Sequence, residues 1–237
     1  MKKITAALIC VFLIFSMISC KNRIAGYTPT EAYENAINTI ETAHSLESIS
    51  EMKIFPKDDA ESVISTVTEI NRYDGENIYT KTSSSPNGAT VEGWYVDGMS
   101  YASYPGMKVK TPISKTEFQE KYQGDSRSVG ILLSIDEDYF KGADFKKTDN
   151  GYSLSFNFSK EQYEALSGGK DLEGELTDEI KYTLLFDKSG NITGAVTVYN
   201  TIISELTVTS LTTVSISFSE VTVKAPENKD EFTLIEQ

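Results

Sequence analysis

The sequence predicts an α+β protein with a large curved antiparallel sheet, covered on its concave face by an N-terminal amphipathic helix and short helices. The helix is indicated by apolar residues at helical spacing from Thr30 to about Glu47. Many segments with alternating polarity follow, and their turns are so short that neighbouring strands must pair antiparallel. A last stretch, Leu206–Phe218, keeps one phase of alternation without a turn residue, which is typical of a long strand in a curled sheet.

The N-terminal helix has a clear start signal at Thr28-Pro29-Thr30-Glu31. Thr28 can cap the helix, Pro29 fits its first turn, and Glu31 completes a capping box. We therefore expect a helix whose apolar face lies on the sheet. That face consists of Tyr33, Ala36, Ile37, Ile40 and Ala43.

The first half of the sheet is predicted as a meander of short strands. Asp74-Gly75, Asp97-Gly98 and Pro105-Gly106 are turn signals between segments of alternating polarity. The expected strands are Ser48–Phe55, Ala60–Tyr73, Asn77–Thr82, Ala89–Val96, Met99–Tyr104 and Met107–Thr111.

The second half is predicted to mix short helices with strands. Capping boxes begin at Ser114 and Ser159, and each opens a short helix. Ser128–Phe140 fits either a helix or a buried strand, and we expect a helix. In Tyr152–Phe158 large apolar residues alternate with small polar ones, which predicts a strand with one buried face. An acidic loop, Lys170–Asp178, and a hairpin of Glu179–Phe186 and Ile192–Tyr199 are expected to follow.

The last β region has no obvious turn. Between Thr201 and Val223 there is no Gly, Pro, Asn or Asp, so we expect one long, bent strand. A loose turn at Ser210–Thr213 is the alternative. The phase of alternation flips at Val221 and Val223, which indicates a bulge near Glu220.

Residues Met1–Cys20 have the pattern of a bacterial export signal. Lys2 and Lys3 precede the uncharged apolar run Ile4–Ile18, which is shorter than a typical membrane span. The stretch 17–20 resembles a lipobox, in which Cys20 becomes the N-terminus and carries a diacylglycerol. We expect a lipoprotein signal peptide at 1–19, a lipidated tether at 20–27 and a single domain at 28–237. A cleaved signal with an incidental cysteine is the alternative.

Composition restricts the partners. The formal net charge of −13 disfavours nucleic acid, because a strongly acidic chain is repelled by phosphates. The only cysteines are Cys10, inside the signal, and Cys20. With Cys20 acylated, the exported domain has no thiol for a disulfide or a cysteine metal site.

The sequence offers little for catalysis, so no enzyme, no metal site and no cofactor are expected. His44 is the only histidine, and no neighbouring motif supplies a nucleophile and an orienting carboxylate. The segment Asp187–Asn191 alternates oxygen ligands like the start of a calcium loop. It lacks the glycine at the sixth place, where Ile192 stands, and the closing glutamate, where Val198 stands. We interpret it as a hairpin turn.

An acylated cysteine, a first amphipathic helix and a long antiparallel meander broken by short helices resemble the LolA/LolB-like lipoprotein-carrier fold. The tracts Gly93–Tyr101 and Pro105–Lys110 are similar to the aromatic-Asp-Gly-Tyr hairpin of small surface lipoproteins with that shape, and Val221–Glu227 is similar to their closing strand. The resemblance implies an incomplete barrel that curls around helices, with room for acyl chains between them. It brings no catalytic residues.

The predicted function is that of a membrane-anchored extracytoplasmic lipoprotein that binds a lipid or other hydrophobic ligand between sheet and helices. The alternative is a protein-interaction or sensor module without a ligand. We expect a monomer, held by acylated Cys20 on the outer face of the cytoplasmic membrane, with an outer-membrane location as the other option. Candidate ligand contacts are Tyr33, Ile37, Ile40, Trp94, Tyr152, Leu154, Phe156 and Phe158, with Phe156 expected to face the ligand.

Overall fold

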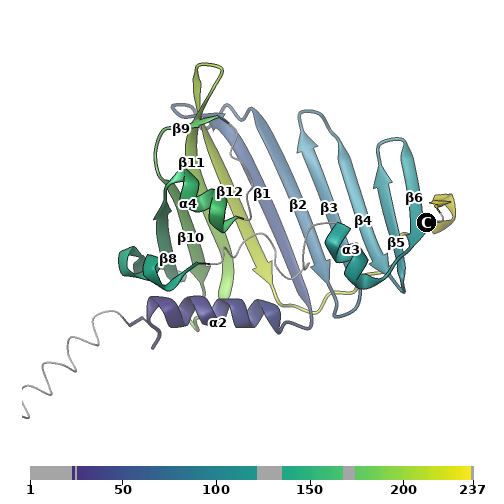
Figure 1. The fold of residues 1–237 in the computed structure, drawn as a ribbon, viewed down its shortest axis with the longest axis horizontal. Helices are drawn as coiled ribbons and strands as arrows, with labels where there is room; N and C mark the ends of the chain where they lie inside the picture. Colours follow the sequence, from purple (N-terminus) through teal and green to yellow (C-terminus); the bar gives the residue numbers. More distant parts are fainter. Residues whose placement is uncertain (1–22, 25, 122–134, 168–173, 236–237) are drawn as a thin grey trace, which may run out of the picture.

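The computed structural model describes residues 23–24, 26–121, 135–167 and 174–235, which form one unclosed, curled sheet with short helices (Figure 1). The sheet has 13 strands in the order β13-β6-β5-β4-β3-β2-β1-β12-β11-β10-β8-β7, with β9 paired to β11 off this path. The predicted α+β class with a large curved antiparallel sheet is confirmed. The expected signal peptide and Cys20 lie outside the described residues.

The strands are β1 Leu46–Pro56, β2 Ser65–Tyr73, β3 Ile78–Ser85, β4 Thr90–Val96, β5 Met99–Tyr104, β6 Met107–Pro112, β7 Asp144–Thr148, β8 Gly151–Phe158, β9 Glu175–Leu176, β10 Ile180–Phe186, β11 Ile192–Ile203, β12 Leu206–Ser217 and β13 Thr233–Leu234.

The first helix, α2 (Pro29–Glu41), begins where the sequence predicts. The Thr28 side chain accepts a hydrogen bond from the Glu31 backbone at 3.2 Å, and the Glu31 carboxylate accepts one from the Thr28 backbone at 2.7 Å. These bonds satisfy backbone donors that the first helical turn leaves unpaired. The helix ends at Glu41 rather than near Glu47, because Leu46 already belongs to β1 and is fully buried.

The meander β1–β6 has the predicted strands, with one corrected boundary. β2 begins at Ser65 and not at Ala60. Before it, the Asp59 carboxylate accepts hydrogen bonds from the Ser62 hydroxyl at 2.5 Å and from the backbone nitrogens of Glu61 and Ser62. An aspartate that binds the backbone following it forms a local turn, which delays the strand.

Both predicted capping boxes of the second half open helices. They are α3 (Lys115–Lys121), capped by Ser114 and Glu117, and α4 (Lys160–Leu166), capped by Ser159 and Gln162. Of the expected helix Ser128–Phe140, residues 128–134 lie outside the described residues. Its end falls in a 3-10 helix, η2 (Glu137–Gly142).

The last β region corrects the prediction in two places. A tight turn at Ser204-Glu205 separates β11 from β12, and both residues have positive φ, 49° and 70°. Such turns normally use Asn or Gly, so neither Ser204 nor Glu205 signals a turn in the sequence. β12 then runs unbroken past 210–213 but ends at Ser217, so there is no loose turn and no strand bulge near Glu220.

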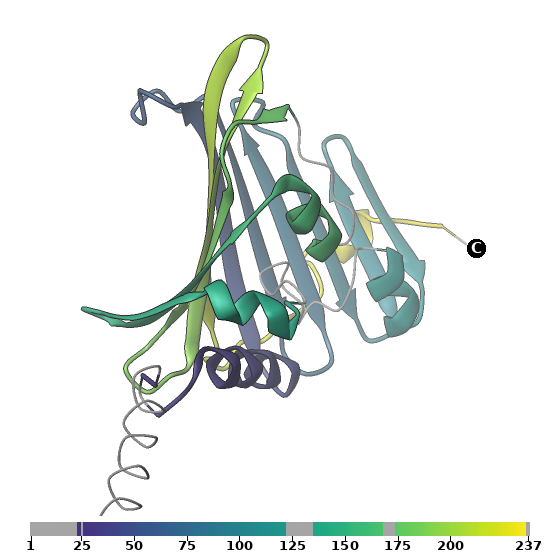
Figure 2. The same ribbon diagram turned by 60° about the vertical axis from the view of Figure 1, so that its left-hand side comes forward.

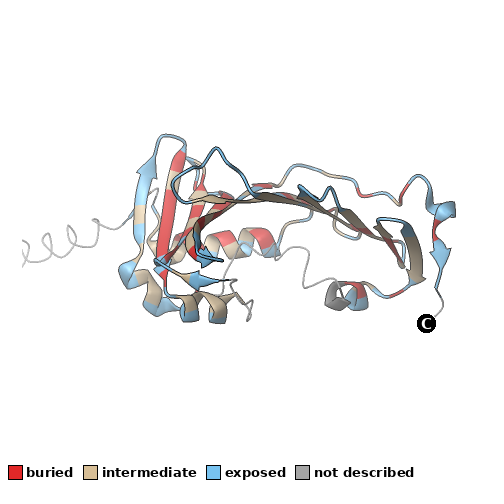
Figure 3. Cartoon of the chain, turned by 90° about the horizontal axis from the view of Figure 1, so that it is seen from above, coloured by how far each residue is buried: buried red, intermediate tan, exposed pale blue. Residues whose placement is uncertain are grey.

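The helices and the C-terminal segment lie on opposite faces of the sheet. The sheet curls around α2, η2 and α4, which lie on its concave side, as does α3 (Figure 2). Viewed from above, the segment 218–232 runs along the opposite side (Figure 3). Phe232 anchors this segment, with its ring 5.5 Å from Tyr101 and 6.1 Å from Trp94, both edge-on. No helix in the described part of the chain is long and apolar enough to cross a membrane.

Candidate functional site

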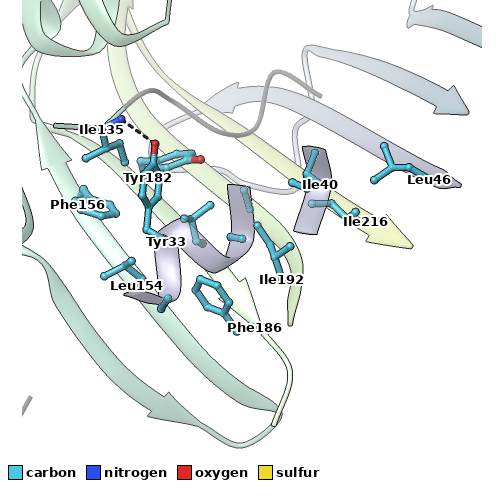
Figure 4. Packing of buried hydrophobic residues seen from close by; sticks show 14 of the residues in the cluster. Tyr33, Ile40, Leu46, Ile135, Leu154, Phe156, Tyr182, Phe186, Ile192 and Ile216 are labelled. Carbon is cyan, nitrogen blue, oxygen red and sulfur yellow. Dashed lines mark hydrogen bonds between the residues drawn. The ribbon is translucent and has the colours of Figure 1, made fainter. Parts of the chain in front are cut away.

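The face of the sheet that the helices cover can be followed through the strand pairing. Leu46 of β1 packs with Ile40 of α2 and Ile216 of β12 in the buried cluster (Figure 4). Paired residues share a face and neighbours along a strand alternate. The even-numbered residues of β1 therefore face the helices and the odd-numbered ones face away. We call the first side the concave face and the second the outer face.

One end of the concave face, on β8 and β10, is closed by packed aromatic rings. The Phe156 and Phe158 rings lie 5.8 Å apart and are inclined by only 8°. From η2, Phe140 meets Phe156 edge-on at 5.4 Å, and Tyr139 meets Phe158 edge-on at 5.4 Å. Phe156 is 3% exposed, and Leu154 and Phe158 are 0% exposed. These side chains are core in the structure.

Tyr33 ties α2 to the segment before η2. Its hydroxyl accepts a hydrogen bond from the Ile135 backbone at 2.9 Å, and its ring lies 5.3 Å from that of Phe140 (Figure 4). Burial raises the pKa of the Tyr33 hydroxyl, so the group remains neutral at physiological pH. Ile40 is buried on the same helix, and Ile37 packs against the cluster half-buried. The structure thus brings seven of the predicted contact residues together: Tyr33, Ile37, Ile40, Tyr152, Leu154, Phe156 and Phe158.

Tyr152 packs at the edge of this cluster, and only Trp94 lies on the other side of the sheet. Tyr152 is half-buried next to the edge strand β7, and its hydroxyl donates to the Lys188 carbonyl at 3.4 Å. Trp94 lies on the outer face, because it pairs with Tyr79 and Tyr101, and Tyr79 pairs with outward-facing Arg72. It is Tyr95 that faces the helices, with its ring 5.5 Å from Phe118 of α3. Sequence alternation placed Trp94 and Tyr95 on opposite faces but did not say which was which.

The centre of the concave face has a floor of small polar side chains that sequence reasoning did not single out as a site. They lie on four of the five neighbouring strands β3-β2-β1-β12-β11: Ser48 and Ser50 on β1, Thr80 and Thr82 on β3, Thr197 and Thr201 on β11, and Ser210 and Thr212 on β12. The Ser48 hydroxyl is fully buried and has no hydrogen-bond partner among the described residues. One signal of this floor was present in the sequence of β12. Ser210 and Thr212 stand at positions where the alternation of that strand otherwise has apolar residues.

Beyond this floor the concave face is apolar again and only half-buried. Met52 pairs with Val67, and Val91 of β4 pairs with Thr82, so all three side chains lie on the concave face. The described helices reach other parts of that face. Tyr163 of α4 hydrogen-bonds Thr197 of β11, and Phe118 of α3 covers Tyr95.

The neighbourhood of His44 does not form a catalytic relay. A hollow of about 570 Å³ is lined by His44, Ser45 and Asp74, among others. The Ser45 hydroxyl donates to the Ser219 carbonyl and accepts from the Val221 backbone, and none of the described hydrogen bonds joins His44 to Ser45 or Asp74. Burial opposes ionisation of Asp74, but bonds from Val223, Asn77 and Glu76 outweigh it and lower its pKa. This carboxylate fastens the C-terminal segment to the sheet.

The turn at Asp187 is structural. Its carboxylate accepts bonds from the Ser189 and Asn191 backbones at 2.8 and 2.9 Å and from the Asn191 side chain at 3.0 Å. These bonds lower the pKa of Asp187 despite partial burial. The predicted hairpin turn is present between β10 and β11. Within the described residues no group of His, Cys, Asp and Glu could hold a metal ion.

Comparison with known proteins finds similar solved structures only. No protein-family model matches the chain, and no curated protein matches its sequence. LprF from Mycobacterium bovis is 10% identical, with a TM-score of 0.44, over 84% of this chain and 96% of that one. A DUF1329 family protein from Desulfovibrio piger ATCC 29098 is 14% identical, with a TM-score of 0.26, over 85% and 96%.

A LolA superfamily protein from Nitrosomonas europaea is also similar. It is 8% identical, with a TM-score of 0.28, over 86% of this chain and 97% of that one. The unclosed, curled sheet with helices on its concave side agrees with the incomplete barrel around helices that the sequence resemblance implies.

Proposed function

We propose that the chain is an extracytoplasmic lipoprotein that binds a lipid or other hydrophobic ligand on its concave face, between sheet and helices. The proposal places acylated Cys20 in the membrane, residues 20–27 as the tether, and 28–237 as one binding domain. It is not proposed to be an enzyme. The protein would act as a monomer on the outer face of the cytoplasmic membrane.

The observation that carries the proposal is the half-buried apolar surface next to the core. Met52, Val67 and Val91 lie on the concave face of central strands, where a folded protein normally covers apolar side chains. An acyl chain laid across them would bury this surface, and each CH₂ removed from water contributes about 0.8 kcal/mol.

In this proposal the aromatic cluster forms the closed end of the site. Phe156, Phe158 and Tyr33 stop the ligand at β8, and the half-buried apolar residues form its open part. Trp94, on the outer face, is not a ligand contact. Of the floor residues, Ser50, Thr80, Thr82 and Thr212 are half-buried and can be reached by a ligand, whereas Ser48, Thr197, Thr201 and Ser210 are already buried.

A neutral fluorescent probe tests binding. N-phenyl-1-naphthylamine has no charge and brightens in apolar surroundings, so it reports an apolar site directly. We expect saturable brightening with the chain from Lys21 onward, reversed by added lipid. The binding function would be refuted if added lipid did not reverse the brightening. It would also be refuted if the folded protein caused no brightening.

The anchor is tested separately. With Cys20→Ser the thioether cannot form, so labelling by radioactive palmitate should disappear and the precursor should accumulate uncleaved. Continued palmitate labelling of this variant would show that the lipid is attached elsewhere.

A second function, that of a protein-interaction module, is favoured by another surface. Exposed aliphatic side chains gather around the β11–β12 turn and the adjoining β1–β2 loop, which are joined by a hydrogen bond from Lys57 N to Thr207 O. They are Val63, Ile64, Ile202, Ile203 and Leu206. If the neutral probe does not bind, Leu206→Ser should abolish binding of the partner protein while the domain remains folded.

A further inference from the structure

Positive charge is distributed unequally between the two faces of the sheet. Strand pairing places nearly all of the lysine and arginine residues of the described strands on the outer face. On the concave face only Lys147 remains, in the edge strand β7, opposite Tyr152. The outward residues are Lys53, Arg72, Lys81, Lys108, Lys110, Lys146 and Lys181.

Among the described side chains of α3, α4 and η2, the lysines do not supply the missing charge. Lys115 of α3 donates to the Gly75 carbonyl at 3.1 Å and lies 4.9 Å from the centre of the Tyr73 ring. Lys160 of α4 pairs with Glu164 at 3.6 Å. Lys141 of η2 pairs with Asp138 at 2.7 Å, and both side chains are largely exposed.

The floor of Ser and Thr side chains on the concave face is polar but almost uncharged. Glu69, opposite Ser50 and Thr82, is the one carboxylate that the described strands β1–β6 direct to the concave face. Around it lie hydroxyl groups, each able to donate and to accept a hydrogen bond. Within the described part of the chain the buried Ser48 hydroxyl has no hydrogen-bond partner. A hydrocarbon chain over this floor would leave such groups unsatisfied, and among the described side chains an anion over the floor would meet a carboxylate but no free cation.

We propose that the ligand of the concave face is an uncharged amphiphile, and that anionic amphiphiles of equal chain length are rejected. This inference rests on the proposed function and names its ligand class. The apolar chain lies against Met52, Val67 and Val91. The head group carries hydroxyl, ether or ester oxygens, and these exchange hydrogen bonds with the half-buried hydroxyls of the floor, Ser50, Thr80, Thr82 and Thr212.

Two photoactivatable probes with the same diazirine acyl chain test the inference on the full chain in phosphatidylcholine vesicles. One probe is a glycerol monoester and the other a phosphate monoester, at equal density in the bilayer. After irradiation and digestion, mass spectrometry gives the yield on peptides of β1–β4. We expect the glycerol probe to label these peptides at least ten-fold more than the phosphate probe, each normalised to its labelling of bulk lipid.

Adjacent residues of β12 provide a matched pair of charge variants. Thr212 faces the concave side, opposite Met52, whereas Thr213 faces outward, opposite Glu51. Thr212→Lys should raise labelling by the phosphate probe several-fold, and Thr213→Lys should leave it unchanged. Glu69→Gln, which keeps the side-chain size, should raise it as well and covers the case in which Thr212→Lys does not fold.

The outcomes separate the two proposals. Equal labelling of the β1–β4 peptides by both probes overturns the head-group inference and leaves the binding function standing. No labelling of these peptides by either probe overturns both. An equal rise with Thr212→Lys and Thr213→Lys also contradicts the inference, because it would reflect net charge rather than the concave face.

Discussion

Met52 of β1 lies directly opposite Val67 of β2 on the concave face, and both side chains are half-buried although their strands are central in the sheet. The next residue, Thr68, lies opposite Glu51 on the outer face. One step along β2 therefore moves a substitution from the proposed ligand surface to the opposite side of the protein.

This geometry gives a matched test of the site. Val67→Asp puts a charge where the acyl chain would lie and should weaken binding of the neutral probe at least ten-fold. Thr68→Asp adds the same charge outside and should leave binding unchanged. The unfolding midpoint of each variant is the control. Equal loss of binding in both variants would contradict a site on the concave face.

Phe156 should behave as a core residue. Its ring is in contact with Phe140, Phe158 and Tyr182, so Phe156→Ser leaves a large void and should cost roughly 3–5 kcal/mol of stability in denaturant unfolding. The sequence had suggested a ligand-facing position, for which stability would be retained and binding lost. Retained stability with lost binding would mean that Phe156 lines the site, whose closed end would then lie deeper, beneath η2.

The β11–β12 turn should be improvable. Ser204 and Glu205 hold left-handed backbone conformations that cost an ordinary residue roughly 1–2 kcal/mol. Replacing the pair by Asn-Gly should therefore raise the free energy of unfolding by about 1 kcal/mol. Asp97→Asn, in a turn that already ends in glycine, is the control and should change little. No gain from the double change would mean that the turn adopts another conformation.

Asp74 should make stability depend on pH. Its folded-state pKa is lowered by bonds from Val223, Asn77 and Glu76, so its contribution is present above the unfolded pKa of about 3.9 and is lost as pH falls through the folded value. Asp74→Asn should cost about 1–2 kcal/mol at pH 7 and progressively less below pH 4. A pH-independent difference between the two proteins would show that the carboxylate charge is not involved.

Local signals explain what the sequence predicted well. The capping boxes at Thr28 and Ser159 placed two helix starts, because a side chain that caps a helix is close in sequence to the donors it satisfies. Alternation likewise placed Phe156 and Phe158 on one buried face.

What the sequence left open depends on long-range contacts. The turn at Ser204-Glu205 has no local signature, since tertiary pairing of β11 with β12 imposes it. Which of Trp94 and Tyr95 faces the helices depends on the C-terminal segment, whose Phe232 covers Trp94 from more than a hundred residues away. The hydroxyl floor appears only when the five strands β3-β2-β1-β12-β11 are placed side by side, so no single stretch of sequence revealed it.

The most direct measurement of ligand binding is a mass spectrum of lipids extracted from the chain beginning at Lys21, made in bacterial cells and purified without detergent. With wild-type protein we predict a lipid class in near-stoichiometric amount. It should be retained by folded Thr68→Asp and lost from folded Val67→Asp. Lipid that is absent from all three proteins, or equally abundant in all three, would contradict binding on the concave face.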